Sequence, residues 1–251
     1  MRRINLALFS VFVALLVSLP VIFVDRYLSR ADSPWQLKMF NEDSLSSFYK
    51  KHYQILGDSA LTQYLGDTEK PTVMVLIDGW GVPYDENTLI EDFASFDKHT
   101  SICAIHKRAF DITRWAEGEE LRFEFQGGLY VSSGDSLKCQ RSRNKPNNLF
   151  EKELCLADDK NSKMSVVLDS LLAEGKWQKI AWTAHQAREG NRIILHDMLR
   201  ELSEIAKKYS NFQFIVQGTH RPTLGTPETR RLYLAPWVPA VFVNANTQFT
   251  K

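Results

Sequence analysis

The sequence predicts an α/β fold, a layered and mostly parallel sheet with helices on both faces. Apolar runs typical of buried strands alternate with segments of helical periodicity from residue 72 onward. The chain has 251 residues, of which 44% are hydrophobic, which is enough for one domain with a sizeable core. A long apolar segment near the N-terminus predicts one transmembrane helix in addition.

The N-terminal segment, residues 4–24, is apolar apart from Asn5, Ser10 and Ser18. About 20 apolar residues suffice to cross a bilayer as a helix, whereas the apolar core of a cleaved signal peptide is usually roughly 7–15 residues long. We therefore expect an uncleaved membrane anchor at 1–27, with a cleaved signal peptide as the alternative. Basic residues flank both ends of the segment, so the orientation rests mainly on the free amino group, and we expect the soluble domain outside the cytoplasm.

The sequence predicts three parts of the chain: the anchor at 1–27, a stalk or helical lead-in at 28–70, and an α/β domain at 71–251. The chain carries 31 basic and 30 acidic residues, for a net charge of +1. This balance gives no electrostatic reason to expect a nucleic-acid partner.

The cysteines leave the redox compartment open. The three of them, Cys103, Cys139 and Cys155, permit one disulfide and leave one thiol. Cys139 with Cys155 is one pairing, which would flank a basic loop.

The first strand of the domain lies in PTVMVLIDGWGVP, residues 71–83. The run from Val73 to Ile77 has no polar alternation, which is typical of a strand buried on both faces of a parallel sheet. It ends at Asp78, and ligands of open α/β sheets bind at the carboxyl edge of the strands. Asp78 is therefore a candidate metal ligand or catalytic group, or else a cap of the following turn or helix.

The remaining elements follow in order. Residues 86–96 carry apolar side chains at helical spacing, and residues 101–105 predict a strand. Glycines and the polar cluster at 132–135 surround a short Leu-Tyr-Val run, which predicts a hairpin-like segment. Five elements complete the domain: a helix at 165–172, a strand at 179–184, a helix at 191–209, a strand at 212–216 and a strand at 238–243.

Three polar residues follow three different strands of the predicted sheet: Asp78, His185 and His220. Because the carboxyl ends of parallel strands meet at one edge, these side chains can converge although they are far apart in the sequence. Carboxylate oxygens and imidazole nitrogens suit Zn²⁺, Mn²⁺ or a similar ion. The alternative is that the two histidines are separate loop or cap residues.

Two further groups would complete a reacting site. Thr100 or Ser101 could supply a hydroxyl nucleophile activated by a metal ion, and the alternative is an ordinary hydroxyl at a strand end. Arg221, next to His220, is the first candidate for binding an anionic substrate group, since a guanidinium matches phosphate or sulfate in a bidentate way.

Together these residues resemble the alkaline phosphatase superfamily, which includes sulfatases, phosphoglycerate mutases and nucleotide phosphodiesterases. VMVLIDGWG is similar to the first metal-binding strand, with Asp78 in the ligand position, and Thr100 or Ser101 falls about where the nucleophile follows. FQFIVQGTHRP is similar to a late strand that ends in an Asp-His pair. The similarity covers residues 71–104 and 178–244.

The resemblance implies a membrane-anchored, metal-dependent hydrolase or transferase that acts on phosphate or sulfate esters of cell-envelope material. It also has departures, because Thr219 stands in place of the aspartate of the Asp-His pair, and threonine is a poor metal ligand. The alternative is a catalytically inactive member of the same fold that acts as an envelope binding or assembly protein. A third reading is a membrane-tethered α/β domain unrelated to phosphatases.

Overall fold

The computed structural model describes residues 45–57, 61–67, 69–107, 128–133, 151–156, 164–185, 190–222 and 225–249. Its elements are, in chain order, α3 (Ser47–His52), β1 (Gln54–Leu56), the 3-10 helix η1 (Leu61–Tyr64), β2 (Thr72–Asp78), β3 (Val82–Pro83), α4 (Glu86–Phe93), β4 (Ser101–Lys107), β5 (Leu129–Ser133), β6 (Lys152–Leu156), α7 (Met164–Ala173), β7 (Lys179–Ala184), α8 (Arg192–Lys208), β8 (Gln213–His220), α9 (Pro227–Arg230), β9 (Tyr233–Leu234) and β10 (Trp237–Val243). The anchor expected at 1–27 lies outside the described residues. Among the helices described, none is long and apolar enough to cross a membrane.

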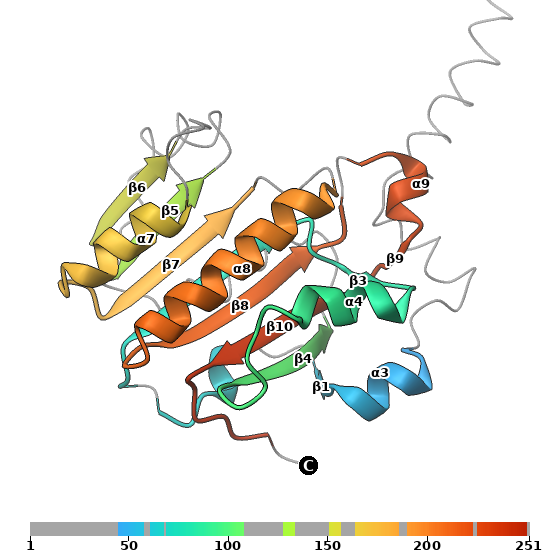
Figure 1. Ribbon diagram of the computed structural model, residues 1–251, viewed down its shortest axis with the longest axis horizontal. Coiled ribbons are helices and arrows are strands. Elements are labelled where there is room, and N and C mark those ends of the chain that lie inside the picture. Colours follow the sequence, from blue (N-terminus) through green and yellow to red (C-terminus); the bar gives the residue numbers. More distant parts are fainter. Residues whose placement is uncertain are drawn as a thin grey trace, which may run out of the picture. The chain divides into compact units, whose positions relative to one another are not determined.

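One sheet of eight strands organises the domain, in the order β1-β4-β10-β8-β2-β7-β5-β6 (Figure 1). Every neighbouring pair is parallel except the two pairs made by β10, which runs antiparallel to β4 and β8. The prediction of a mostly parallel sheet is therefore confirmed. Strand β2 lies between β8 and β7, and all seven of its residues are buried, which accounts for its unbroken apolar run.

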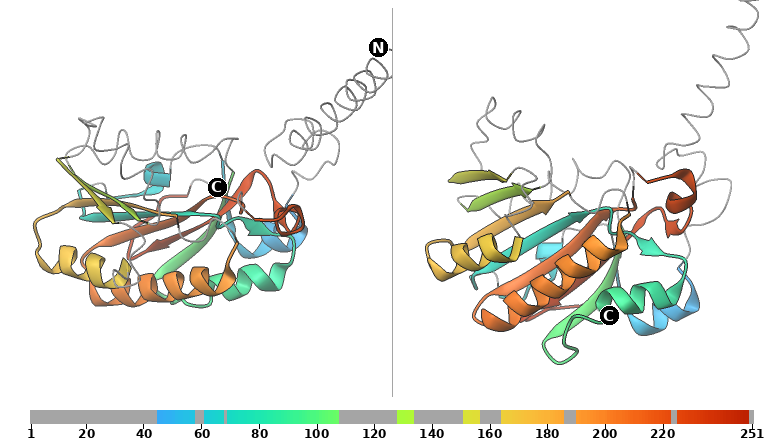
Figure 2. Two further views of the ribbon diagram at one scale, coloured as in Figure 1. Left: turned by 90° about the horizontal axis from the view of Figure 1, so that it is seen from above. Right: turned by 45° about the horizontal axis from the view of Figure 1, so that its top comes forward.

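Helices α4, α7 and α8 lie along one face of the sheet (Figure 2). Alternation along β2 turns Val73 towards this face, where it joins one core cluster with Leu168 of α7 and Leu199 of α8. Met74 turns the other way and joins a smaller cluster with Leu61 of η1. The sequence predicts helices on both faces, but the longer helices of the described residues share one face, and the other carries η1.

The segment before residue 71 contributes to the sheet. Strand β1 pairs in parallel with β4, with Ile55 opposite Ile105. Helix α3 is joined to the domain by the buried Tyr49, whose hydroxyl donates a hydrogen bond to the carbonyl oxygen of Pro83 at 2.6 Å. Residues from 45 onward, which the sequence assigns to a stalk or lead-in, are thus part of the α/β fold.

The described cysteines include one in a disulfide and one free thiol, which the sequence permits. Cys155 is disulfide-bonded, and Cys103 is a free thiol. The remaining cysteine, Cys139, lies outside the described residues.

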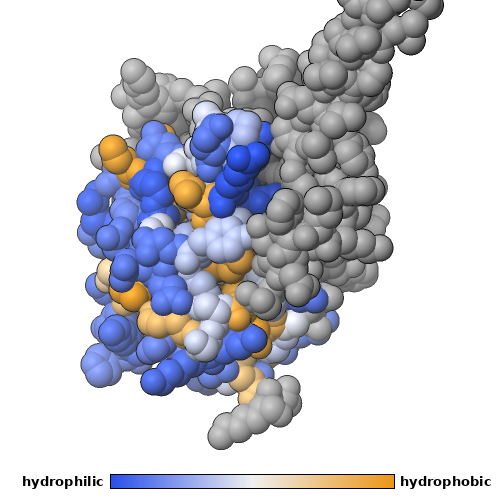
Figure 3. Space-filling model, turned by 90° about the vertical axis from the view of Figure 1, so that its right-hand side faces the viewer, coloured by the Kyte–Doolittle hydropathy of each residue, from blue (hydrophilic) through white to orange (hydrophobic). Residues whose placement is uncertain are grey.

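Where the right-hand side of the molecule is coloured in Figure 3, the surface is mostly hydrophilic, with smaller apolar areas between polar ones. The large apolar side chains that stay exposed come from several elements. They include Ile90 of α4, Val166 of α7 and Ile193 of α8. Each of these helices also turns apolar side chains inward, since each contributes to the core cluster between the helices and the sheet.

Candidate functional site

Asp78, His185 and His220 meet at the carboxyl edge of the sheet. Asp78 is the last residue of β2, His185 follows β7 directly, and His220 is the last residue of β8, and these three strands are neighbours. The register between β2 and β8 shifts after Ile77, which sets Asp78 opposite His220. Parallel pairing therefore brings together the three residues that the sequence singled out.

Two glycines allow the loop after Asp78 to pack closely against β8 at this edge of the sheet. Gly79 has a φ of 87°, in the left-handed region that favours glycine, and it turns the chain directly after Asp78. A Cβ on Gly218 of β8 would lie 1.8 Å from the carbonyl oxygen of Trp80, so any larger residue would collide with the loop. The loop after Asp78 can thus pass against β8 only because position 218 is glycine.

The carboxylate of Asp78 is held from both oxygens. The hydroxyl of Thr219 donates a hydrogen bond to Oδ1 at 2.7 Å, and Nδ1 of His185 makes a short hydrogen bond with Oδ2. Nε2 of His220 lies 3.8 Å from Oδ1. All these residues are buried. Thr219, where the sequence resemblance leads one to expect an aspartate, therefore donates a hydrogen bond to the carboxylate.

The environment of Asp78 favours its ionised form. Burial acts to raise the pKa of Asp78, but the hydrogen bond with His185, the charges of His220 and His185 and the hydroxyl of Thr219 lower it further than burial raises it. The pKa of Asp78 consequently lies well below its usual range. At neutral pH the side chain is a carboxylate that accepts hydrogen bonds and can fix the orientation of His185.

The donor set around Asp78 does not fit a resident metal ion. Both carboxylate oxygens already accept hydrogen bonds, and His185 uses Nδ1 on Asp78. Nδ1 of His220 lies 2.7 Å from the carbonyl oxygen of Arg221, so one nitrogen of that ring is also engaged. Among the residues that the structure describes, no group of three or more His, Cys, Asp or Glu side chains could hold a metal ion.

Ser132 belongs to the same cluster, although the sequence does not point to it. Its Oγ lies 3.3 Å from Nε2 of His185, on the side of the ring away from Asp78. The Leu-Tyr-Val run, for which the sequence predicts a hairpin-like segment, instead lies in β5, a strand that pairs in parallel with β7 and β6. Ser132 therefore reaches the carboxyl edge too. The signal that could have found it is the short apolar run that ends at this serine.

Thr100 and Ser101 lie at the other edge of the sheet. Ser101 begins β4 and pairs with Val243, which in turn pairs with Phe214 near the start of β8. Phe214 pairs with Val73, five residues before Asp78, which at about 3.3 Å per residue puts the two edges about 16 Å apart. Thr100 and Ser101 lie where β4 begins, whereas Asp78 lies where β2 ends. The distance between these two edges is too long for either hydroxyl to attack a group held by Asp78.

Arg221 is buried, and its guanidinium faces the backbone. Nη1 lies 3.4 Å from the carbonyl oxygen of Tyr233 and 3.5 Å from that of Arg230. These contacts tie the end of β8 to the segment around α9 and β9. The structure therefore gives Arg221 a bracing role for this segment.

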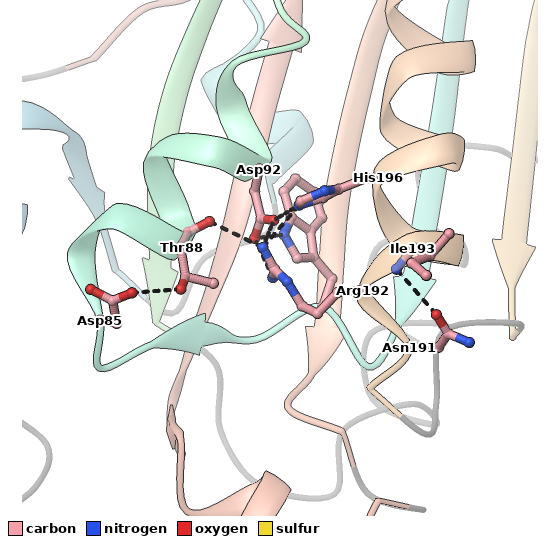
Figure 4. A network of polar contacts seen from close by, with 8 residues as sticks. Asp85, Thr88, Asp92, Asn191, Arg192, Ile193 and His196 are labelled. Carbon is pink, nitrogen blue, oxygen red and sulfur yellow. Dashed lines mark hydrogen bonds and ion pairs between the residues drawn. The ribbon is translucent and has the colours of Figure 1, made fainter.

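A second buried aspartate, Asp92 on α4, is the centre of another polar network (Figure 4). Arg192 of α8 holds it with two hydrogen bonds, from Nη2 to Oδ1 at 2.5 Å and from Nη1 to Oδ2 at 3.1 Å. Nε2 of His196 lies 3.0 Å from Oδ1, and the indole of Trp80 donates to Oδ2 at 3.0 Å. This network joins α4, α8 and the loop after Asp78.

No protein-family model matches the chain, and no curated protein matches it. Solved structures that resemble its fold include phosphoglycerol transferase GacH of Streptococcus pyogenes in complex with sn-glycerol-1-phosphate, at 12% identity and a TM-score of 0.48 over 76% of this chain and 72% of that one. Lipoteichoic acid synthase LtaP of Listeria monocytogenes aligns at 8% identity and a TM-score of 0.42, over 73% and 68%.

A third similar structure is a protein of the alkaline phosphatase superfamily from Vibrio parahaemolyticus, at 9% identity and a TM-score of 0.39, over 74% of this chain and 62% of that one. All three TM-scores are below 0.5, so these similarities give no information on the roles of individual residues in this chain.

Proposed function

We propose that the chain is a hydrolase or transferase that acts on phosphate or sulfate esters, with Asp78 and His185 at its reacting centre. The observation that carries this proposal is the hydrogen bond between the buried carboxylate of Asp78 and Nδ1 of His185, at the carboxyl edge where three parallel strands end. A carboxylate in this position orients an imidazole that can take up and return a proton. The class of ester follows from the resemblance of VMVLIDGWG and GTHRP to the alkaline phosphatase superfamily.

Two further features support a membrane-anchored domain outside the cytoplasm. The apolar segment at 4–24 supports a membrane anchor at 1–27, as the sequence predicts. The disulfide at Cys155 supports a domain outside the cytoplasm, since disulfides persist in oxidising compartments. The substrate would then be an ester of cell-envelope material.

Metal dependence is the part of the sequence-based hypothesis that the described residues support least. Thr219 donates a hydrogen bond to Oδ1 of Asp78, the oxygen that lies 3.8 Å from Nε2 of His220. Nδ1 of His185 is hydrogen-bonded to the other oxygen, Oδ2. We therefore assign no step to Zn²⁺ or Mn²⁺. Metal analysis of the purified full chain tests this directly.

The test of the proposed function is turnover of aryl esters by the purified full chain in detergent. We expect hydrolysis of at least one of three substrates, namely bis-p-nitrophenyl phosphate, p-nitrophenyl phosphate and p-nitrophenyl sulfate. Asp78→Asn should lower the rate by about 10³-fold to 10⁴-fold, since it removes the group that orients the imidazole. Asp169→Asn, at an exposed ion pair with Lys208, is the matched control and should leave the rate unchanged.

A second candidate function is favoured by one observation, the full engagement of Asp78 within the protein. In this case the chain is an inactive member of the fold that binds an envelope component. Absence of turnover on all three esters, together with binding of a glycerol phosphate polymer that survives Asp78→Ala, would establish this candidate in place of the enzyme. Asp78→Ala should then lower only the thermal stability, because it removes the buried carboxylate that His185 and Thr219 both contact.

A further inference from the structure

Two adjacent serines of β5 face opposite sides of the sheet. Ser133 accepts a hydrogen bond from the indole of Trp182 at 2.8 Å, on the side of the helices. Ser132 faces the other side, where its Oγ lies 3.3 Å from Nε2 of His185. The parallel register makes this contact possible, because Ser132 pairs with Thr183, whose side chain faces the same side as His185 two residues later.

His185 connects Ser132 to Asp78 through its two ring nitrogens. Nδ1 meets the carboxylate of Asp78, which can only accept a hydrogen bond, so we assign the ring proton to Nδ1. Nε2 then carries the lone pair and accepts a hydrogen bond from the Ser132 hydroxyl. Hydroxyl, imidazole and carboxylate thus follow one another in the order of a nucleophile, its general base and the group that orients the base.

All three residues are buried. The side chains of Asp78 and His185 are both 0% exposed, and Ser132 as a whole residue is 6% exposed. The carboxylate and the imidazole are therefore shielded from water, which strengthens the interaction that orients the imidazole.

We propose that Ser132 is the nucleophile of this site, with His185 as its general base and Asp78 as the residue that positions His185. The proposal rests on the proposed function for the class of substrate, and it assigns the reaction to side chains of this chain without a metal ion. It also replaces Thr100 and Ser101, which lie at the other edge of the sheet, as the source of the hydroxyl.

The reaction proceeds through a covalent intermediate. Oγ of Ser132 attacks the phosphorus of the ester while its proton passes to Nε2 of His185. The bond from phosphorus to the leaving oxygen breaks, and the departing alkoxide takes the proton from His185. Water or an acceptor hydroxyl then attacks the phosphorylated serine and gives its proton to His185, which returns it to Oγ as the bond to Ser132 breaks.

The charges of the site favour a phosphodiester as substrate. The carboxylate of Asp78 lies only one side chain away from Ser132, and it repels a second negative charge. Arg221, the cation that the sequence suggested for an anion, has its guanidinium against two backbone carbonyls. A diester carries one negative charge on its phosphate and a monoester nearly two, so the diester is the better match.

Labelling with a fluorophosphonate probe tests the nucleophile directly. The probe phosphonylates a serine that a histidine has activated, and peptide mass spectrometry of the full chain locates the label. We expect the label on Ser132, no label in Ser132→Ala, and at least about 100-fold slower labelling in His185→Gln. Ser133→Ala is the matched control, because it changes the neighbouring serine on the opposite face and should label at the rate of the unaltered chain.

Hydrolysis of bis-p-nitrophenyl phosphate separates this proposal from the proposed function. Ser132→Ala should lower kcat at least about 10³-fold, and Asp78→Asn should lower kcat while KM stays unchanged, since Asp78 acts through His185. A labelled Ser132 without diester hydrolysis would uphold the nucleophile and overturn the substrate class. Hydrolysis that persists in a folded Ser132→Ala variant, or absence of label on Ser132, would overturn the nucleophile.

Discussion

Asp78 and Asp92 are both fully buried aspartates, and each contacts an imidazole, but the two imidazoles have different further contacts. His185, beside Asp78, has its Nε2 3.3 Å from the hydroxyl of Ser132. Asp92 is held chiefly by the guanidinium of Arg192, which keeps its proton at any physiological pH, and Nε2 of His196 contacts both of them. Burial, ion pairing and a neighbouring histidine therefore do not by themselves mark a reacting site. What matters is whether the imidazole beside the carboxylate can pass a proton onward to a hydroxyl.

The two carboxyl groups also differ in the direction of their pKa shifts. Burial raises the pKa of Asp92 above its ordinary value, more than Arg192, Trp80 and His196 together lower it. For Asp78, the partners outweigh burial, and the pKa is lowered. Trp80 connects the two regions, because it lies in the loop that leaves Asp78 and its indole binds Asp92. We infer that Asp92 fixes α4, α8 and this loop, whereas Asp78 serves the site.

The largest expected difference concerns activity. Asp78→Asn should lower kcat for bis-p-nitrophenyl phosphate by about 10³-fold to 10⁴-fold, the loss typical of a carboxylate that orients a catalytic histidine. Asp92→Asn should leave kcat close to that of the unaltered chain at temperatures where the variant is folded, because Asp92 contacts Arg192, Trp80 and His196 and not the residues of the site. Equal losses in the two variants would abolish the distinction between the two aspartates.

The second difference concerns stability. Arg192→Ala should lower the free energy of unfolding by about 3 kcal/mol, because it leaves a buried carboxylate without its main partner. Urea unfolding of the full chain in detergent measures this loss. Asp92→Asn combined with Arg192→Ala is the control, and it should be more stable than Arg192→Ala alone, since the uncompensated charge is then absent. A double variant no more stable than the single one would show that the helices do not depend on this pair.

The smallest expected difference is in the pH dependence of stability. Because the pKa of Asp78 is lower in the folded chain than in the unfolded one, its contribution is fully present above the unfolded value of about 4 and is lost as the pH falls through the folded value. The pKa of Asp92 is raised, so its ionisation lowers stability as the pH rises above about 4. Asp78→Asn should therefore flatten the loss of stability in acid, whereas Asp92→Asn should steepen it.

Thermal unfolding followed between about pH 3 and pH 7 measures these slopes. Asp197→Asn is the surface control for both variants, because that side chain of α8 is exposed to solvent. Slopes that change in the same direction for Asp78→Asn and Asp92→Asn would contradict the opposite pKa shifts.

Much of the fold could be predicted from the sequence, because the elements have clear patterns. The unbroken apolar run before Asp78 predicted a central strand, and the parallel strands explain why His185 and His220 arrive at the same edge. The pairing of Asp92 with Arg192 could not be predicted, since helical spacing gives the face of a helix but not its partner across the domain.

The candidate nucleophile was missed for a physical reason. Serine and aspartate around 132–135 suggested a turn, so the end of β5 was mistaken for a hairpin. Thr100 and Ser101 have hydroxyl groups, but they lie at the wrong edge of the sheet. The residue before a strand and the residue after it lie at opposite ends of that strand, and Ser101 begins β4. Strand direction, which local sequence does not give, decides which hydroxyl reaches His185.

The most direct test of the central claim is hydrolysis of bis-p-nitrophenyl phosphate by the full chain after removal of metal ions with a chelator, with the metal content measured on the same sample. The account predicts that turnover persists at a metal content far below one ion per chain and disappears in Ser132→Ala. Turnover that vanishes on chelation and returns with Mn²⁺ or Zn²⁺ while Ser132→Ala remains active would contradict it.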